Sequence, residues 1–122
     1  MITGGNVTIV VSDMEASVRF YSEVLGLKLI KRTAHDWVTF EAGSGLTIGL
    51  TLASKHYPAP GTKGGMLIGL EVDGKMEDVV ERLTAKGVRF TGPIVHDERA
   101  GVFANFEDPD GAAFYLWQSA WS

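Results

Sequence analysis

The chain has 122 residues, of which 45% are apolar and 21% charged, a composition typical of one globular domain rather than of a disordered or membrane-embedded chain. Its formal net charge is -4 without a dense cluster of lysine and arginine, which argues against a nucleic-acid-binding surface. It contains no cysteine, and this excludes disulfides, thiolate metal sites and a cysteine nucleophile.

The first half of the chain predicts a helix followed by three strands. Ser12-Asp13-Met14-Glu15 has the spacing of a capping box ahead of an amphipathic run, and Gly26 stands where a left-handed C-cap would fall. We therefore expect a helix over residues 13–25. Three runs rich in β-branched and aromatic residues, separated by turn residues, predict strands; they are Leu27–Lys31, Trp37–Glu41 and Leu46–Leu52.

The second half of the chain shows the same order of signals. Val79, Val80 and Leu83 fall on one face of a helical run that Gly87 terminates, which predicts a helix over residues 75–86. The segment 108–111, Asp-Pro-Asp-Gly, is a strong turn sequence. Four short runs predict strands; they are Val88–Thr91, Ile94–His96, Val102–Phe106 and Ala112–Gln118.

The two halves form an internal repeat. Val7 and Ile9 match Ile68 and Leu70 at a constant spacing that also relates the two helix-terminating glycines. Each half therefore reads β-α-β-β-β. Because one helix covers only one face of such a sheet, the two halves can share a cupped surface on the other face, where we expect the ligand site.

Several local stretches resemble one known superfamily. They are residues 10–17 leading to Phe20-Tyr21, then 24–27, 71–73 and 108–111. Over nearly its whole length the chain resembles the vicinal-oxygen-chelate superfamily of glyoxalase, bleomycin-resistance and extradiol-dioxygenase relatives. The resemblance implies an α+β fold of two βαβββ modules in tandem, about residues 1–53 and 65–122 of a single domain, forming a cupped mixed sheet with the helices outside. It leaves the activity open, because this fold hosts enzymes and binding proteins alike.

The resemblance also locates the positions at which metal-using relatives carry their ligands, in the first and last strand of each module. Those positions hold Asn6, Gly49, Leu67 and Tyr115, and none of these is a useful donor for a divalent metal. We therefore expect no metal centre of the family type and no cofactor. The remaining donors, His35, His56 and His96, fall in or beside loops.

Strand alternation predicts which side chains line the cup. The resulting surface combines aromatic rings with hydroxyl and amide groups, which suits a partly flat organic ligand held by stacking and hydrogen bonds. The alternative is that these aromatic residues fill the cup themselves or form a dimer contact. The predicted lining residues are Asn6, Thr8, Trp37, Thr39, Thr47, Gly49, Thr51, Leu67, Glu71, Phe103, Asn105, Tyr115 and Trp117.

Glu71 is the acidic residue that alternation places inside the cup, where it would act as an anion for a cationic ligand or as a general base. The structural alternative is a salt bridge at the strand end. His56 and His96 lie in segments that could fold over the cup, and each is a candidate general acid or base.

The primary hypothesis is a metal-independent protein that binds an aromatic or cationic small molecule. The alternatives are a metal-free lyase or isomerase working through Glu71, His96 or Tyr115, and a metal-dependent lyase or dioxygenase-like enzyme with displaced ligands His35, His56, His96 or Glu71. A closed cup in an interaction module is a further alternative, and whether the chain is an enzyme stays open. We expect a cytoplasmic protein without membrane partners, because the sequence lacks a signal peptide and an apolar run of about 20 residues. The absence of a basic cluster argues against nucleic-acid partners. The resemblance implies a homodimer, because small two-module relatives often pair through strand edges.

Overall fold

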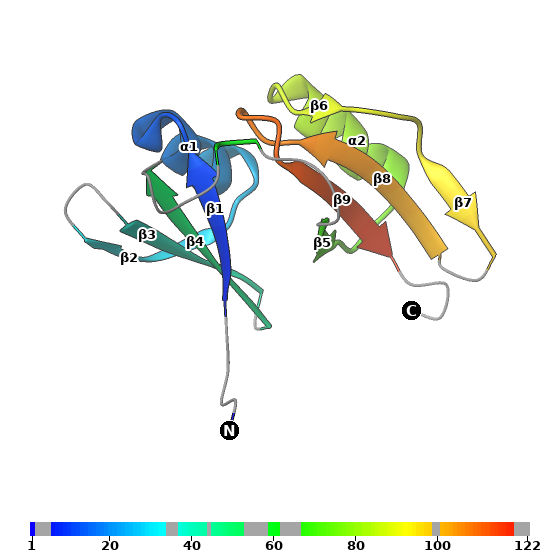
Figure 1. Cartoon of the computed structure of the whole chain (residues 1–122). Coiled ribbons are helices and arrows are strands. Elements are labelled where there is room, and N and C mark those ends of the chain that lie inside the picture. The colour runs from blue at the N-terminus through cyan, green and yellow to red at the C-terminus, as the bar shows by residue number, and fades with distance from the viewer. Residues whose placement is uncertain are drawn as a thin grey trace. The chain divides into compact units, whose positions relative to one another are not determined.

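The computed structural model describes Met1 and residues 6–33, 37–43, 45–52, 59–61, 67–98 and 101–118 (Figure 1). The chain divides into two compact units, Met1–Thr62 and Lys63–Ser122. Each unit carries helical structure on one face of a mixed sheet, so the fold is α+β, as predicted; unit one is βαβββ, and in unit two the strand after the helix is divided into two short strands that pair with the same neighbour. Among the described residues, no helix has the length and apolar character that crossing a bilayer requires.

Unit one follows the predicted order of elements. They are β1 (Val7–Val11), α1 (Met14–Arg19), η1 (Phe20–Val24), β2 (Lys28–Thr33), β3 (Trp37–Ala42) and β4 (Leu46–Leu52). The sheet order is β1-β4-β3-β2, in which β1 runs parallel to β4 and the other neighbours are antiparallel. β2 extends to Thr33, beyond its predicted end, because its outer residues still pair with β3.

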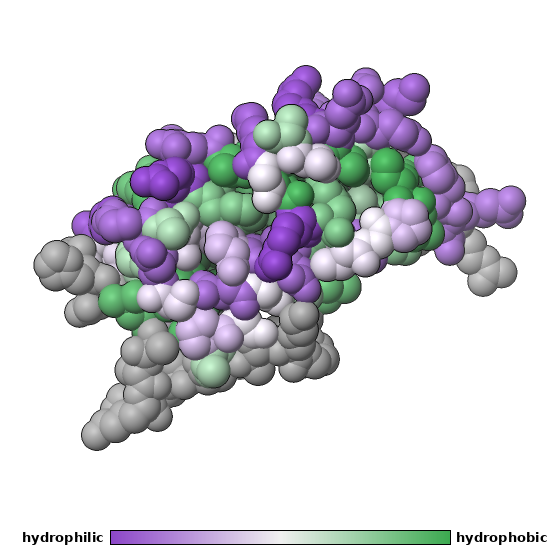
Figure 2. Space-filling view, turned by 90° about the horizontal axis from the view of Figure 1, so that it is seen from above, coloured by the Kyte–Doolittle hydropathy of each residue, from purple (hydrophilic) through white to green (hydrophobic). Residues whose placement is uncertain are grey.

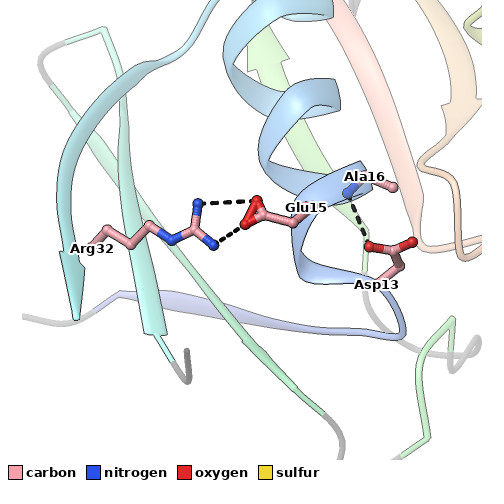
Figure 3. Close-up of polar contacts among 4 residues, drawn as sticks. All are labelled: Asp13, Glu15, Ala16 and Arg32. Carbon is pink, nitrogen blue, oxygen red and sulfur yellow. Dashed lines mark hydrogen bonds and ion pairs between the residues drawn. The ribbon is translucent and has the colours of Figure 1, made fainter. Parts of the chain in front are cut away.

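The predicted helix over residues 13–25 consists of an α-helical and a π-helical part. Asp13 is the N-cap, and its carboxylate accepts a hydrogen bond from the Ala16 amide at 3.1 Å (Figure 3). From Phe20 the helix widens into the π-helix η1, and the consecutive rings of Phe20 and Tyr21 are both buried, edge to face at 5.3 Å. Gly26, with φ of 76°, follows the helix in the left-handed conformation that its position predicts.

An ion pair joins helix α1 to strand β2. The Arg32 guanidinium donates to both carboxylate oxygens of Glu15, with 3.3 Å between Nη1 and Oε2 (Figure 3). This hydrogen bond lowers the pKa of Glu15 below its ordinary value and raises the pKa of Arg32. All six residues of β2 are exposed, so this contact is made at the outer edge of the sheet.

Unit two repeats the arrangement with shorter outer strands. Its elements are β5 (Ile68–Glu71), α2 (Met76–Ala85), β6 (Arg89–Phe90), β7 (Val95–Asp97), β8 (Gly101–Glu107) and β9 (Ala113–Gln118). The sheet order is β5-β9-β8-β6, with β7 also paired to β8. β5 runs parallel to β9, and β8 runs antiparallel to it.

The core of each unit lies between its helix and one face of its sheet. In unit one Phe40 and Ile48 are fully buried, and in unit two the rings of Phe106 and Phe114 stack at 5.2 Å. The charged residues of α2 point outward, and the surface seen in Figure 2 is accordingly rich in hydrophilic side chains with hydrophobic patches between them. Residues adjacent to these core positions along each strand face the other side of the sheet.

Candidate functional site

The non-helical face of the unit-one sheet brings together six of the predicted lining residues. In the register of the strands, Gly49 of β4 lies between Thr8 of β1 and Thr39 of β3, and Trp37 lies opposite Thr51. Alternation places all of these side chains on one face. We call this surface the aromatic face of unit one; it consists of Thr8, Trp37, Thr39, Thr47, Gly49 and Thr51. Asn6 is exposed just before β1, and its amide oxygen accepts a 3.4 Å hydrogen bond from Thr8.

The indole of Trp37 lies directly over Gly49. A Cβ atom built on Gly49 would come within 2.6 Å of Cη2 of this ring, so the ring fills the space that a side chain would otherwise take. Its Nε1 donates a 2.7 Å hydrogen bond to the Thr39 hydroxyl. Because the polar atom of Trp37 is satisfied within the protein, this half-buried side chain offers an apolar ring surface.

The corresponding face of unit two carries two rows of side chains across the sheet. One row is Gly69, Tyr115 and Asn105, and the next row is Glu71, Trp117 and Phe103. We call this surface the aromatic face of unit two, defined by these six residues. Leu67 precedes β5 and is 56% exposed, so it stands at the border of this face rather than in a strand.

Tyr115 lies over Gly69 as Trp37 lies over Gly49. Cε1 of the tyrosine ring would stand 2.8 Å from a Cβ atom built on Gly69, and the hydroxyl oxygen would stand nearer, at 2.5 Å. Glu71 follows two residues later on the same face of β5, about 7 Å along the strand. Among the described residues, the side chains of Tyr115, Asn105 and Glu71 have no hydrogen-bond or ion-pair partner. They are therefore available to a ligand.

His96 does not join Glu71 and Tyr115. It lies in strand β7, where it pairs in register with Val102, and so it faces the helical side of the sheet. There its Nε2 lies 3.5 Å from the Glu77 carboxylate of α2. Glu71, His96 and Tyr115 were predicted as alternative acid or base candidates, and in unit two His96 lies on the opposite face of the sheet from the other two; Glu71 is exposed. His35 and His56 lie outside the described residues.

The positions that hold metal ligands in metal-using relatives do not fit a metal ion here. Gly49 has no side chain and lies beneath Trp37, Leu67 is apolar, and Asn6 and Tyr115 are poor donors for a divalent ion. Within the described ranges, no group of three or more histidine, aspartate or glutamate residues could hold a metal ion. The chemistry of these faces therefore comes from rings, hydroxyl groups, the Asn105 amide and carboxylates; the carboxylates are Glu71, Glu41, which pairs with Thr47, and Glu107, which pairs with Ala113.

A shallow recess adjoins Glu71 at the end of β5. Its volume is about 520 Å³, and its lining residues come from the segment after β5 and from α2: Glu71, Val72, Asp73, Val79 and Arg82. The recess carries charges of both signs, from Glu71, Asp73 and Arg82.

Known proteins that resemble this chain share its family and its fold. The family model described as the Glyoxalase/Bleomycin resistance protein/Dioxygenase superfamily matches residues 5–116. A member of that superfamily from Sphaerobacter thermophilus DSM 20745 is 28% identical, with a TM-score of 0.75, covering 96% of this chain and 97% of the other. No curated protein matches the chain.

Two further solved structures come from Streptomyces sp. CB03234. One is TnmS3, an antibiotic binding protein that is 27% identical, with a TM-score of 0.73, covering 98% of this chain and 99% of the other. The second is a glyoxalase/bleomycin resistance protein that is 28% identical, with a TM-score of 0.70, covering 93% of this chain and 100% of the other. Similarity along nearly the full length of both chains shows that the whole fold is shared.

Proposed function

Since the chain belongs to the Glyoxalase/Bleomycin resistance protein/Dioxygenase superfamily, we propose that it binds a small organic molecule with an aromatic ring and a cationic group, without a metal ion. The observation that carries this proposal is the aromatic face of unit two, where Tyr115, Asn105 and Glu71, which have no polar partner within the described ranges, stand in the same two rows as Trp117 and Phe103. The similarity to an antibiotic binding protein supports a binding role.

The chemistry of this face matches the two parts of such a ligand. Broad rings hold a flat ligand by stacking, which is worth about 0.5–1.5 kcal/mol per pair beyond the buried area. Glu71 supplies the negative charge that attracts a ligand cation, and because it is exposed we expect this attraction to be modest. Tyr115 and Asn105 lie directly opposite each other, and together they offer donors and acceptors that orient the ligand.

Three probes separate ring shape from charge in a calorimetric binding experiment. Naphthylmethylamine is flat and cationic, naphthylmethanol is flat and neutral, and adamantylamine is globular and cationic. We expect naphthylmethylamine to bind most tightly. In Glu71→Gln its advantage over naphthylmethanol should shrink by about two- to fivefold, the range of an exposed ion pair. Glu81→Gln, an equal charge change on the exposed side of α2, should bind like the wild type.

Thermal unfolding tests whether the protein is independent of metal ions. Thermal unfolding with chelator, and then with added zinc, nickel, manganese or iron, should show no change in midpoint, because only an ion that binds the folded state raises it. A midpoint that rises with one metal and falls again with chelator would contradict the proposal. So would the failure of all three probes to bind.

A metal-free enzyme is the second candidate, because Tyr115 and Glu71 are two proton-transfer groups on one face of unit two, neither with a polar partner in the part of the chain that the structure describes. Steady turnover of a bound molecule in the presence of chelator, lost in Tyr115→Phe, would favour this candidate over simple binding.

We also propose that the protein is a cytoplasmic homodimer that pairs through strand edges. The exposed edge strand β2, with Leu29 and Ile30 at 40% and 50% exposure, supports pairing because exposed edges tend to be covered by another chain. Sedimentation velocity that gives a monomer at all concentrations would contradict the dimer.

A further inference from the structure

Each unit places one aromatic ring over a strand glycine, and the ring comes from a different register position in each unit. Trp37 reaches Gly49 diagonally from the neighbouring strand β3, whereas Tyr115 covers Gly69, its direct partner across β5 and β9. Glycine weakens a strand, so its presence within a strand commonly marks a close approach by another group. Here the approaching group is a ring in both cases.

The backbone does not require glycine at either position. Neither Gly49 nor Gly69 has a φ angle in the left-handed region, so alanine would fit both strands without backbone strain. An alanine side chain would instead clash with the ring. The Cβ atom of alanine would stand 2.6 Å from Cη2 of Trp37 at position 49 and 2.8 Å from Cε1 of Tyr115 at position 69. Because carbon atoms pack at about 3.5–4.0 Å, each ring would have to lift by about 1 Å.

We propose that Gly49 and Gly69 are specificity-determining positions, which hold the rings of Trp37 and Tyr115 down on the sheet so that the aromatic faces select flat ligands over globular ones. This inference rests on the proposed function. A ring that lies against the sheet leaves a smooth floor on which a planar ligand keeps full stacking contact. A lifted ring tilts away from the sheet and loses that contact, while a globular ligand, which touches it at few points, loses little.

Each position acts on the ring of its own unit. Over Gly49 the indole nitrogen of Trp37 is already hydrogen-bonded to Thr39, so only stacking on the aromatic face of unit one depends on this glycine. Gly69 also determines where the hydroxyl of Tyr115 lies, on the strand face that carries Glu71. On the aromatic face of unit two, Gly69 therefore governs both the preference for flat shape and hydrogen bonding to a ligand.

The test compares Gly49→Ala and Gly69→Ala with matched variants in the same units. Gly45→Ala and Gly92→Ala are the controls, because a Cβ atom at either position meets nothing within 4 Å and neither backbone is left-handed. The near-ultraviolet circular dichroism of Gly49→Ala should differ from that of wild type and Gly45→Ala, since the Trp37 ring has moved. The ratio of naphthylmethylamine to adamantylamine affinity should fall about five- to tenfold in Gly49→Ala and in Gly69→Ala, and it should be unchanged in both controls.

A double variant tests whether Gly49 acts through the Trp37 ring or only through a general loss of packing. If Gly49 acts through the ring, then adding Gly49→Ala to Trp37→Val should leave the affinity ratio of the single Trp37→Val variant unchanged. A wild type that binds none of the probes would overturn the proposed function and the inference with it. A wild type that prefers the flat probe, together with a Gly49→Ala variant that keeps both its spectrum and its preference, would overturn the inference alone.

Discussion

Asp108 is the polar residue on which the β8–β9 turn depends, and its replacement by alanine should destabilise the protein strongly. Only 1% of this residue is exposed, and its Oδ1 accepts hydrogen bonds from the amides of Asp110 and Ala112 at 3.0 and 2.7 Å. Asp108→Ala removes both bonds and leaves two partly buried N–H groups without this acceptor. The turn joins the strands that place Asn105 opposite Tyr115, so the site depends on it as well.

Hydrogen-bond energies give the expected size of this effect. Each partly buried donor that loses its acceptor costs about 1–2 kcal/mol, so we expect a loss of about 2–4 kcal/mol in the free energy of unfolding. For a chain of this length, 1 kcal/mol corresponds to about 4 °C, which gives a fall of about 8–16 °C in Tm. Differential scanning calorimetry measures it, with Asp108→Asn as control, because the amide oxygen still accepts. A Tm of Asp108→Ala within about 2 °C of wild type would refute the reasoning.

Three further substitutions test the structure elsewhere. Thr39→Val leaves the Trp37 indole nitrogen without its acceptor and should cost about 1 kcal/mol of unfolding free energy; an unchanged near-ultraviolet spectrum and Tm would contradict this. In Arg32→Ala the pKa of Glu15 should rise toward its ordinary value in an NMR titration. Since the folded-state pKa of Glu15 is depressed, the pair stabilises the wild type above the unfolded-state pKa and is lost as the pH falls through the folded-state pKa, so wild type should lose more stability in acid than the variant. Phe114→Ala empties a fully buried position and should cost about 3–5 kcal/mol, measured by urea unfolding.

Much of the fold follows from periodic patterns that the sequence displays directly. In β4 the apolar Ile48 and Leu50 alternate with Gly49 and Thr51, and shifting this strand by one residue would turn its apolar side chains away from the helix. For this reason both the strands and the composition of the two aromatic faces could be predicted. The C-terminal ends of both helices could also be predicted from the sequence, because Gly26 and Gly87 adopt the left-handed conformation that terminates a helix.

The finer geometry depends on pairing and rotamers that no single segment encodes. Trp37 lies over Gly49 because of the register between β3 and β4 and the bond to Thr39, neither of which appears in the local pattern. His96, predicted at a strand end beside a loop, pairs with β8 and lies on the helical side of the sheet near Glu77. The sequence pattern predicts one helix over residues 13–25 and does not distinguish its π-helical part, Phe20–Val24.

The internal repeat pairs a glycine in one half of the chain with an aromatic residue in the other. In the alignment of the two halves that pairs Leu50 with Leu116, Gly49 corresponds to Tyr115. The position that is bare in one half thus bears the ring in the other, so the two halves are not interchangeable copies. A fusion of two copies of the first half would present the Trp37 ring twice and would lack both the phenol of Tyr115 and the carboxylate of Glu71.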